Sequence, residues 1–200
     1  MMKKLIYSIT IVLSVVILSA SGIQKKTAKV YTIIPEETTV NWTAYKTTSK
    51  IPVSGIFKEV IIENEQTGSS IYEVYNGLKF NLPIQSIFSQ SALRDGKIKK
   101  YFFAKMINTA KISGVIQLVD NTNGKVKITM NGVSEELPIK FKISDNSITI
   151  DAVMDLDNWK AQLALSALND ACEDLHAGPD GESVTWSEVK IHVTSKVKIE

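Results

Sequence analysis

Most of the chain alternates between apolar and polar residues with a period of two, the pattern of β-strands that have one buried and one solvated face. Val126, Ile128 and Met130, for example, alternate with lysine and threonine. The same alternation recurs along much of the chain from Thr38 onward. It predicts about eight strands, near residues 38–46, 54–65, 71–84, 108–119, 124–131, 135–144, 147–156 and 184–199.

Short turn sequences separate the predicted strands. The segments 66–70 and 121–124 and the pairs Asn131-Gly132 and Asp145-Asn146 are typical of tight turns. Tight connections make neighbouring strands antiparallel. Such strands in up-and-down order leave two exposed edges unless the sheet closes, so we expect a mainly β protein with an eight-stranded antiparallel β-barrel.

Two segments interrupt the β pattern. Residues 89–105 lack alternation and hold a basic cluster followed by aromatic residues. Residues 162–177 place apolar residues at helical spacing and end at Gly178-Pro179, which predicts a short helical insertion before the last strand. We expect both segments to cap the barrel or line its mouth.

The N-terminus has the three parts of a secretory signal peptide. Lys3 and Lys4 precede an apolar run from Leu5 to Leu18, and small residues follow at 19–22. We therefore expect residues 1–22 to be a signal peptide and residues 23–200 to form one domain, periplasmic or secreted, without a membrane span after cleavage. The chain has one cysteine, Cys172, so neither a lipid-anchor cysteine after the signal nor an internal disulfide is expected.

Charge and motifs exclude several classes of function. The chain has 23 basic and 21 acidic residues. Removal of residues 1–22 takes away Lys3 and Lys4 and no acidic residue, which leaves 21 of each. A near-neutral chain gives no support to general nucleic-acid binding. The sequence has no Gly-rich phosphate loop, HExxH, CxxC or GxSxG motif, so we expect no cofactor and no metal.

The inward apolar side chains are the main candidates for a binding site. Such a stripe is usually core, but small inward residues at Ala44, Ala110, Gly114 and Ala152 leave room in a barrel interior. The interior is therefore either a ligand cavity or a filled core. The candidate ligand-binding residues are Trp42, Phe57, Leu78, Phe80, Leu82, Phe102, Phe103, Ile128, Met130, Ile139, Phe141, Ile150 and Met154.

Two polar pairs each have two interpretations. Arg94 and Asp95, beside a lysine cluster, could meet a phosphate or carboxylate head group, or could fix a loop, and the second use is the commoner. Cys172 and His176 lie four apart on the predicted helix, a spacing that suits a metal site or a thiolate–imidazole pair. Cys172 also continues the apolar stripe, and we favour a packing role.

From about Tyr31 to the C-terminus the chain resembles the YceI-like family, the polyisoprenoid-binding proteins of the bacterial periplasm. The resemblance rests on the order and spacing of short motifs, which are Val40-Asn41-Trp42-Thr43-Ala44-Tyr45-Lys46, Gly55-Ile56-Phe57, Leu82-Pro83-Ile84-Gln85-Ser86-Ile87, Arg94-Asp95, Phe102-Phe103 and Met130-Asn131-Gly132-Val133-Ser134. It implies a lipocalin-like barrel whose interior takes a long isoprenoid chain, as in a polyprenyl lipid or a quinone tail. The chain differs from the family pattern at Gly96-Lys97, where a histidine is common, and in its longer, more acidic helical segment near Cys172.

The sequence thus predicts a periplasmic protein that binds an isoprenoid, an isoprenoid quinone or a related lipid and is not an enzyme. Two alternatives stay open. One is a filled-barrel envelope-stress or interaction protein without a ligand, and the other is an enzyme that uses Cys172 and His176. The pattern makes no prediction of oligomeric state.

Overall fold

One antiparallel sheet organises the computed structural model, which describes residues 28–64 and 66–200. In the described part of the chain it has eleven strands, in the order β3-β5-β7-β8-β9-β10-β11-β1-β2-β6, with β4 paired to β1. Their bounds are β1 Tyr31–Lys46, β2 Ile51–Phe57, β3 Ile61–Ile62, β4 Thr67–Gly68, β5 Lys79–Pro83, β6 Ile87–Phe88, β7 Lys111–Leu118, β8 Asn123–Met130, β9 Val133–Ser144, β10 Ser147–Asp155 and β11 Thr185–Ile199.

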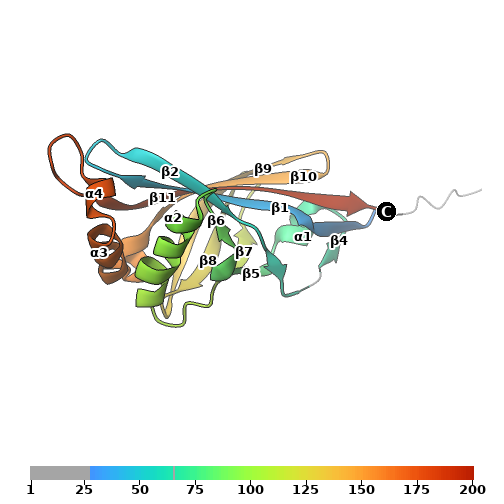
Figure 1. The fold of residues 1–200 in the computed structure, drawn as a ribbon. Helices are drawn as coiled ribbons and strands as arrows, with labels where there is room; N and C mark the ends of the chain where they lie inside the picture. The colour runs from blue at the N-terminus through green and yellow to red at the C-terminus, as the bar shows by residue number, and fades with distance from the viewer. Residues whose placement is uncertain (1–27, 65) are drawn as a thin grey trace, which may run out of the picture.

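The sheet curls into a half-barrel, so that β5, β7 and β8 lie across from β1, β2, β10 and β11 (Figure 1). Within the described residues, no strand pairing joins the edge strand β3 to the edge strand β6. The chain itself crosses this gap, because residues 58–60 run directly from β2, the neighbour of β6, to the edge strand β3. One continuous concave face therefore encloses the interior.

The predicted fold class is confirmed, and the predicted number of strands is wrong. Three of the eleven described strands, β3, β4 and β6, have two residues each. The others correspond to the predicted strands. Pairings of two residues are too short to produce an alternating pattern, and this is why the sequence did not reveal them.

Short helices close the two ends of the curled sheet. At one end lie α2 (Ala92–Lys97), the π-helix η2 (Ile98–Phe102), the 3₁₀ helix η3 (Phe103–Lys105), α3 (Gln162–Asp170) and α4 (Glu173–His176), and α1 (Ile71–Tyr75) lies at the other (Figure 1). The 3₁₀ helices η1 (Ile84–Ser86) and η4 (Leu156–Trp159) join strands. The predicted helical insertion is present, divided at Ala171 and Cys172 into α3 and α4.

The first part of the predicted strand 71–84 is instead helix α1. Ser70 caps this helix: its hydroxyl accepts a hydrogen bond from the Glu73 amide at 3.3 Å, and the Glu73 carboxylate accepts one from the Ser69 amide at 2.7 Å. A serine followed three residues later by glutamate is a helix-start signal that competes with the period-two pattern. Tyr75 has the same parity as Lys79, so it would lie on the polar face of a strand, but in α1 it is buried.

Apolar residues of the concave face form the core, and glycines allow the closest approaches. In β8, Val126, Ile128 and Met130 are buried while Lys127 is exposed. A Cβ atom at Gly114 would overlap the ring of Phe80 on the neighbouring strand, so the glycine makes room for the aromatic side chain. Burial of each large apolar side chain stabilises the fold by about 1.5–3 kcal/mol.

No helix within residues 28–64 and 66–200 combines the length and the apolar character needed to cross a membrane. The predicted signal peptide, residues 1–22, lies outside the described residues.

Replacement of Ser70 by alanine should lower the free energy of unfolding by about 1 kcal/mol, because an amide at the start of α1 loses its side-chain partner. Chemical denaturation monitored by circular dichroism measures the change. Ser49→Ala, in an exposed turn, is the control and should have little effect. An unchanged midpoint in Ser70→Ala would show that the cap does not stabilise α1.

Candidate ligand-binding site

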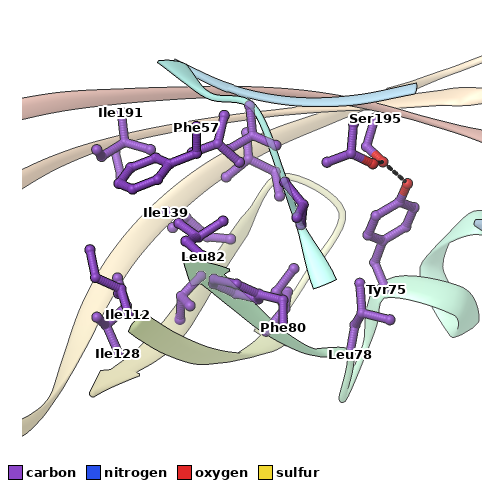
Figure 2. A pocket seen from close by; sticks show the side chains of 18 of the residues that line it. Phe57, Tyr75, Leu78, Phe80, Leu82, Ile112, Ile128, Ile139, Ile191 and Ser195 are labelled. Atoms are coloured by element: carbon purple, nitrogen blue, oxygen red, sulfur yellow. Dashed lines mark hydrogen bonds between the residues drawn. The ribbon is translucent and has the colours of Figure 1, made fainter. Parts of the chain in front are cut away.

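The concave face encloses an inner chamber of about 120 Å³ next to helix α1. Its walls come from strands on both sides of the curl, and Figure 2 shows Phe57 and Ile191 facing Leu82, Phe80 and Ile112 across the space. The lining residues are Ile33, Thr38, Val40, Phe57, Val60, Ile62, Tyr75, Leu78, Phe80, Leu82, Ile112, Ile116, Val126, Ile128, Leu137, Ile139, Ile150, Ala152, Met154, Ile191, Val193 and Ser195.

Three hydroxyl-bearing residues lie at the α1 end of this chamber, and they bond to one another. The Tyr75 hydroxyl donates to Ser195 Oγ at 2.6 Å, and Ser195 Oγ lies 2.5 Å from Thr38 Oγ1 (Figure 2). Burial raises the pKa of Tyr75 to about 12, against the opposing effect of its hydrogen bond to Ser195, so the phenol is neutral at physiological pH. Among residues 28–64 and 66–200, no charged residue lines the inner chamber.

A middle chamber, also of about 120 Å³, continues toward helices η2 and α3. Phe102 and Phe103 form part of its wall and pack edge to face with ring centroids 4.9 Å apart. Trp42 covers Gly55, where any side chain would overlap the indole. The lining residues are Trp42, Ala44, Phe57, Ile87, Ile98, Phe102, Phe103, Ile112, Met130, Met154, Leu156, Leu165, Leu168, Thr185, Trp186, Val189 and Ile191.

The two chambers meet at a neck. Phe57, Ile112, Met154 and Ile191 line both chambers, so the same four side chains form the wall between them. These residues come from β2, β7, β10 and β11. Methionine is unbranched and changes rotamer readily, so the width of the neck depends on a side chain that can move aside.

An outer pocket of about 350 Å³ follows the middle chamber between α2 and α4. It shares Trp42, Ala44, Ile98, Leu168 and Thr185 with the middle chamber. Its lining also includes charged and polar side chains, among them Lys46, Arg94, Lys97 and His176. The three spaces therefore form one series that runs from an apolar end next to α1 to a polar end between α2 and α4.

A family model described as the YceI-like domain matches residues 31–200. The chain belongs to the YceI-like family. The resemblance seen in the sequence is thereby confirmed.

Two solved structures resemble this YceI-like chain in fold. A structure of a polyisoprenoid binding domain from Saccharophagus degradans, implicated in plant cell wall breakdown, superposes with a TM-score of 0.60 at 10% identity and covers 85% of this chain and 98% of its own. The BcnA protein of Burkholderia cenocepacia superposes with a TM-score of 0.55 at 14% identity and covers 83% of this chain and 99% of its own. No curated protein matches this chain at a significant level.

In this YceI-like structure, almost all of the predicted ligand-binding residues line a chamber. Leu78, Phe80, Leu82, Ile128, Ile139 and Ile150 line the inner chamber, Trp42, Phe102, Phe103 and Met130 line the middle one, and Phe57 and Met154 line both. Phe141 is the exception, because it is buried in the core without lining either chamber.

The Arg94-Asp95 pair fixes a loop. Asp95 is buried, and its carboxylate accepts hydrogen bonds from the Ser89 amide at 2.9 Å and from the Ser89 hydroxyl. An Arg94 guanidinium nitrogen donates to the Ser89 carbonyl oxygen at 3.2 Å. Asp95 is thus committed to the loop, whereas Arg94 also lines the outer pocket.

Cys172 and His176 both line the outer pocket. Cys172 is buried, and Nδ1 of His176 lies 2.7 Å from the Thr185 hydroxyl. In the described residues, no group of three or more His, Cys, Asp and Glu side chains is arranged to hold a metal. The two residues therefore contribute to the wall between α4 and the sheet.

Several lining residues were not among the sequence candidates. Ile191, Val193 and Ser195 share one parity along β11, so alternation contained the signal that they face inward. Tyr75 could not be found by parity, because it belongs to the helix that was predicted as a strand. Lys46 reaches the outer pocket from the end of β1, a contact that depends on the position of α4.

The pKa of His176 should lie below its ordinary value of 6.5, because burial and the positive charges of Lys46 and Lys97 disfavour the imidazolium. Replacing Lys46 with methionine should therefore raise this pKa. An NMR titration of the histidine ring protons measures it. Lys99→Met, which removes a lysine that does not line the outer pocket, is the control and should leave the pKa in place. A His176 pKa that does not respond to Lys46→Met would place the Lys46 charge too far away to act.

Proposed function

We propose that this YceI-like protein is a binding protein that holds a long apolar lipid, such as a polyisoprenoid or an isoprenoid quinone, inside the curled sheet. The observation that carries the proposal is the series of two apolar chambers that leads to a polar outer pocket. An extended chain with one polar end has the same sequence of properties.

The size and chemistry of the chambers support a hydrocarbon ligand. Each chamber has about 120 Å³ and is lined almost entirely by aliphatic and aromatic side chains. Apolar cavities of roughly 150 Å³ stay dry and bind small hydrocarbons such as benzene. Each chamber is thus large enough for a short branched segment, and a longer chain would pass the neck after Met154 changes rotamer.

Apolar burial supplies enough free energy for such binding. At about 25 cal/mol per Å² of apolar surface, a buried chain of several isoprene units gains on the order of 5–10 kcal/mol before ordering costs are subtracted. No catalytic group is needed. The relative from Saccharophagus degradans, described as a polyisoprenoid binding domain, supports the same class of ligand for this chain.

We place the protein in the periplasm or outside the cell on the basis of the N-terminal sequence. The basic start, the apolar run and the small residues up to Gly22 are those of an exported precursor.

Mass spectrometry of organic extracts tests the proposal. The protein is purified under native conditions, and the extract is compared with that of an unrelated periplasmic protein purified in the same way. We expect an isoprenoid or related lipid to be enriched. Extracts free of lipid, together with no binding of added isoprenoids, would favour the alternative of a filled interior.

Met130→Gln should reduce the amount of co-purified lipid per folded protein, because it places a polar amide in the apolar wall of the middle chamber, where a hydrocarbon would have to pack against it. Lys127→Gln, on the exposed face of the same strand, should leave the lipid content unchanged. Lipid is quantified by mass spectrometry, and folded protein by circular dichroism. Equal lipid content in the two variants would mean that Met130 does not contact the ligand.

Expression of the full chain in a Gram-negative host should yield a periplasmic product that begins near residues 20–23. Intact mass of the purified protein shows the cleavage site. A product of the periplasm that still contains Lys3 and Lys4 would contradict the signal peptide.

A further inference from the structure

We propose that the outer pocket is a binding site for the anionic head group of the lipid, a phosphate or a carboxylate, with Lys46, Arg94 and Lys97 as its cations. This inference rests on the proposed function, since it assigns the end of the ligand that the apolar chambers leave outside.

In the part of the chain that the structure describes, these three cationic side chains line the outer pocket and no carboxylate does. None of the three takes part in a salt bridge within the described part of the chain. The acid next to Arg94 in sequence, Asp95, is buried and directs its carboxylate to Ser89. The positive charge of the pocket is therefore not neutralised by its own wall.

Backbone carbonyls of the helical insertion hold two of the cations, one at the end of α3 and one in α4. Lys97 Nζ donates to the Ala171 carbonyl oxygen at 2.9 Å, and Lys46 Nζ donates to the Leu175 carbonyl oxygen at 2.7 Å. An ammonium group has three donors, so each lysine keeps two for a ligand. Because both side chains are half-buried, their charges are fixed in place at the rim of the pocket.

His176 gives a second indication that the two charges converge. It lies in the same wall, and after burial the largest effects that lower its pKa come from Lys46 and Lys97. Both lysines therefore act on one point inside the pocket. The pocket also contains the neutral side chains of Tyr45 and Ser91, whose hydroxyl groups can donate to oxygen atoms of an anion.

The charge distribution fixes the direction of the ligand. A phosphate or carboxylate in the inner chamber would lose its hydration among residues that carry no compensating charge. At the outer pocket the same group meets ammonium and guanidinium donors, the partners that bind such oxygens most strongly. The hydrocarbon end thus enters first, and the anionic end stops between α2 and α4 (Figure 1).

The test compares geranylgeranyl phosphate with geranylgeraniol, which share one chain and differ in head-group charge. Their Kd values are measured on the mature protein through the fluorescence of Trp42 and Trp186, which line the middle chamber. We expect the phosphate to bind about tenfold more tightly at low salt. This preference should decrease as salt is raised, because ions screen a pocket that opens to solvent.

Lys97→Met and Lys46→Met should each remove most of the preference for phosphate and leave the affinity for geranylgeraniol unchanged. The matched control is Lys99→Met, because Lys99 Nζ also donates to a backbone carbonyl oxygen at 2.9 Å, that of Gln85, but does not line the outer pocket. Lys97→Arg should keep the preference, since it retains the charge. Unchanged binding of geranylgeraniol shows in each variant that the chambers remain folded.

Equal affinity of the unmodified protein for the two lipids would overturn the head-group site while leaving the proposed function intact. An equal loss of preference in Lys99→Met and Lys97→Met would overturn it as well, because net charge alone would then explain the effect. Inorganic phosphate that binds as tightly as geranylgeranyl phosphate would assign the pocket to a free anion. Failure of both lipids to bind would contradict the proposed function itself.

Discussion

The structure depends on the burial of one continuous apolar face whose side chains do not fill the space that the curled sheet encloses. Small side chains are one reason why space stays unfilled: Ala152 lines the inner chamber, and Ala44 lines the middle one. An unfilled cavity costs about 24 cal/mol per Å³, so a chamber of about 120 Å³ lowers stability by on the order of 3 kcal/mol. The sheet tolerates this cost because its long strands bury large apolar areas elsewhere. A ligand that fills the chambers would recover much of it.

The two ends of the interior differ in chemistry because different helices close them. At the α1 end, Tyr75, Ser195 and Thr38 satisfy one another and present no charge, so this end suits only an apolar group. At the other end, lysines from β1 and α2 bind carbonyl oxygens of Leu175 in α4 and of Ala171 at the end of α3. Hydrogen bonds that secure the helical insertion thus also place positive charge at the opening, so the insertion serves both packing and electrostatics.

Alternation along the chain was enough to predict the antiparallel fold class and most of the chamber walls, because a strand that turns one face inward exposes every second residue to the interior. It failed where local hydrogen bonding decides the structure. Ser70 and Glu73 form a helix cap that overrides the alternating pattern through Tyr75.

Alternation also could not separate Phe141, which is core, from Ile139, which lines the inner chamber, because parity gives the direction of a side chain and not the shape of the void beside it. The outer pocket could not be predicted from the sequence, since only the tertiary fold brings Lys46 and Lys97 to the carbonyl oxygens of the α3–α4 insertion.

The neck between the chambers links ligand binding to the closure of the sheet. Phe57 lies on β2 and Ile112 on β7, close to the two opposite edges of the sheet, and in the described part of the chain no strand pairing joins the edge strands β6 and β3. A hydrocarbon chain in the neck would contact both side chains together with Met154 and Ile191. It would therefore supply apolar packing across the gap where backbone hydrogen bonds are absent. Since any ligand that binds only the folded state stabilises it by RT ln(1 + [L]/Kd), a lipid in the neck would act as an additional part of the core.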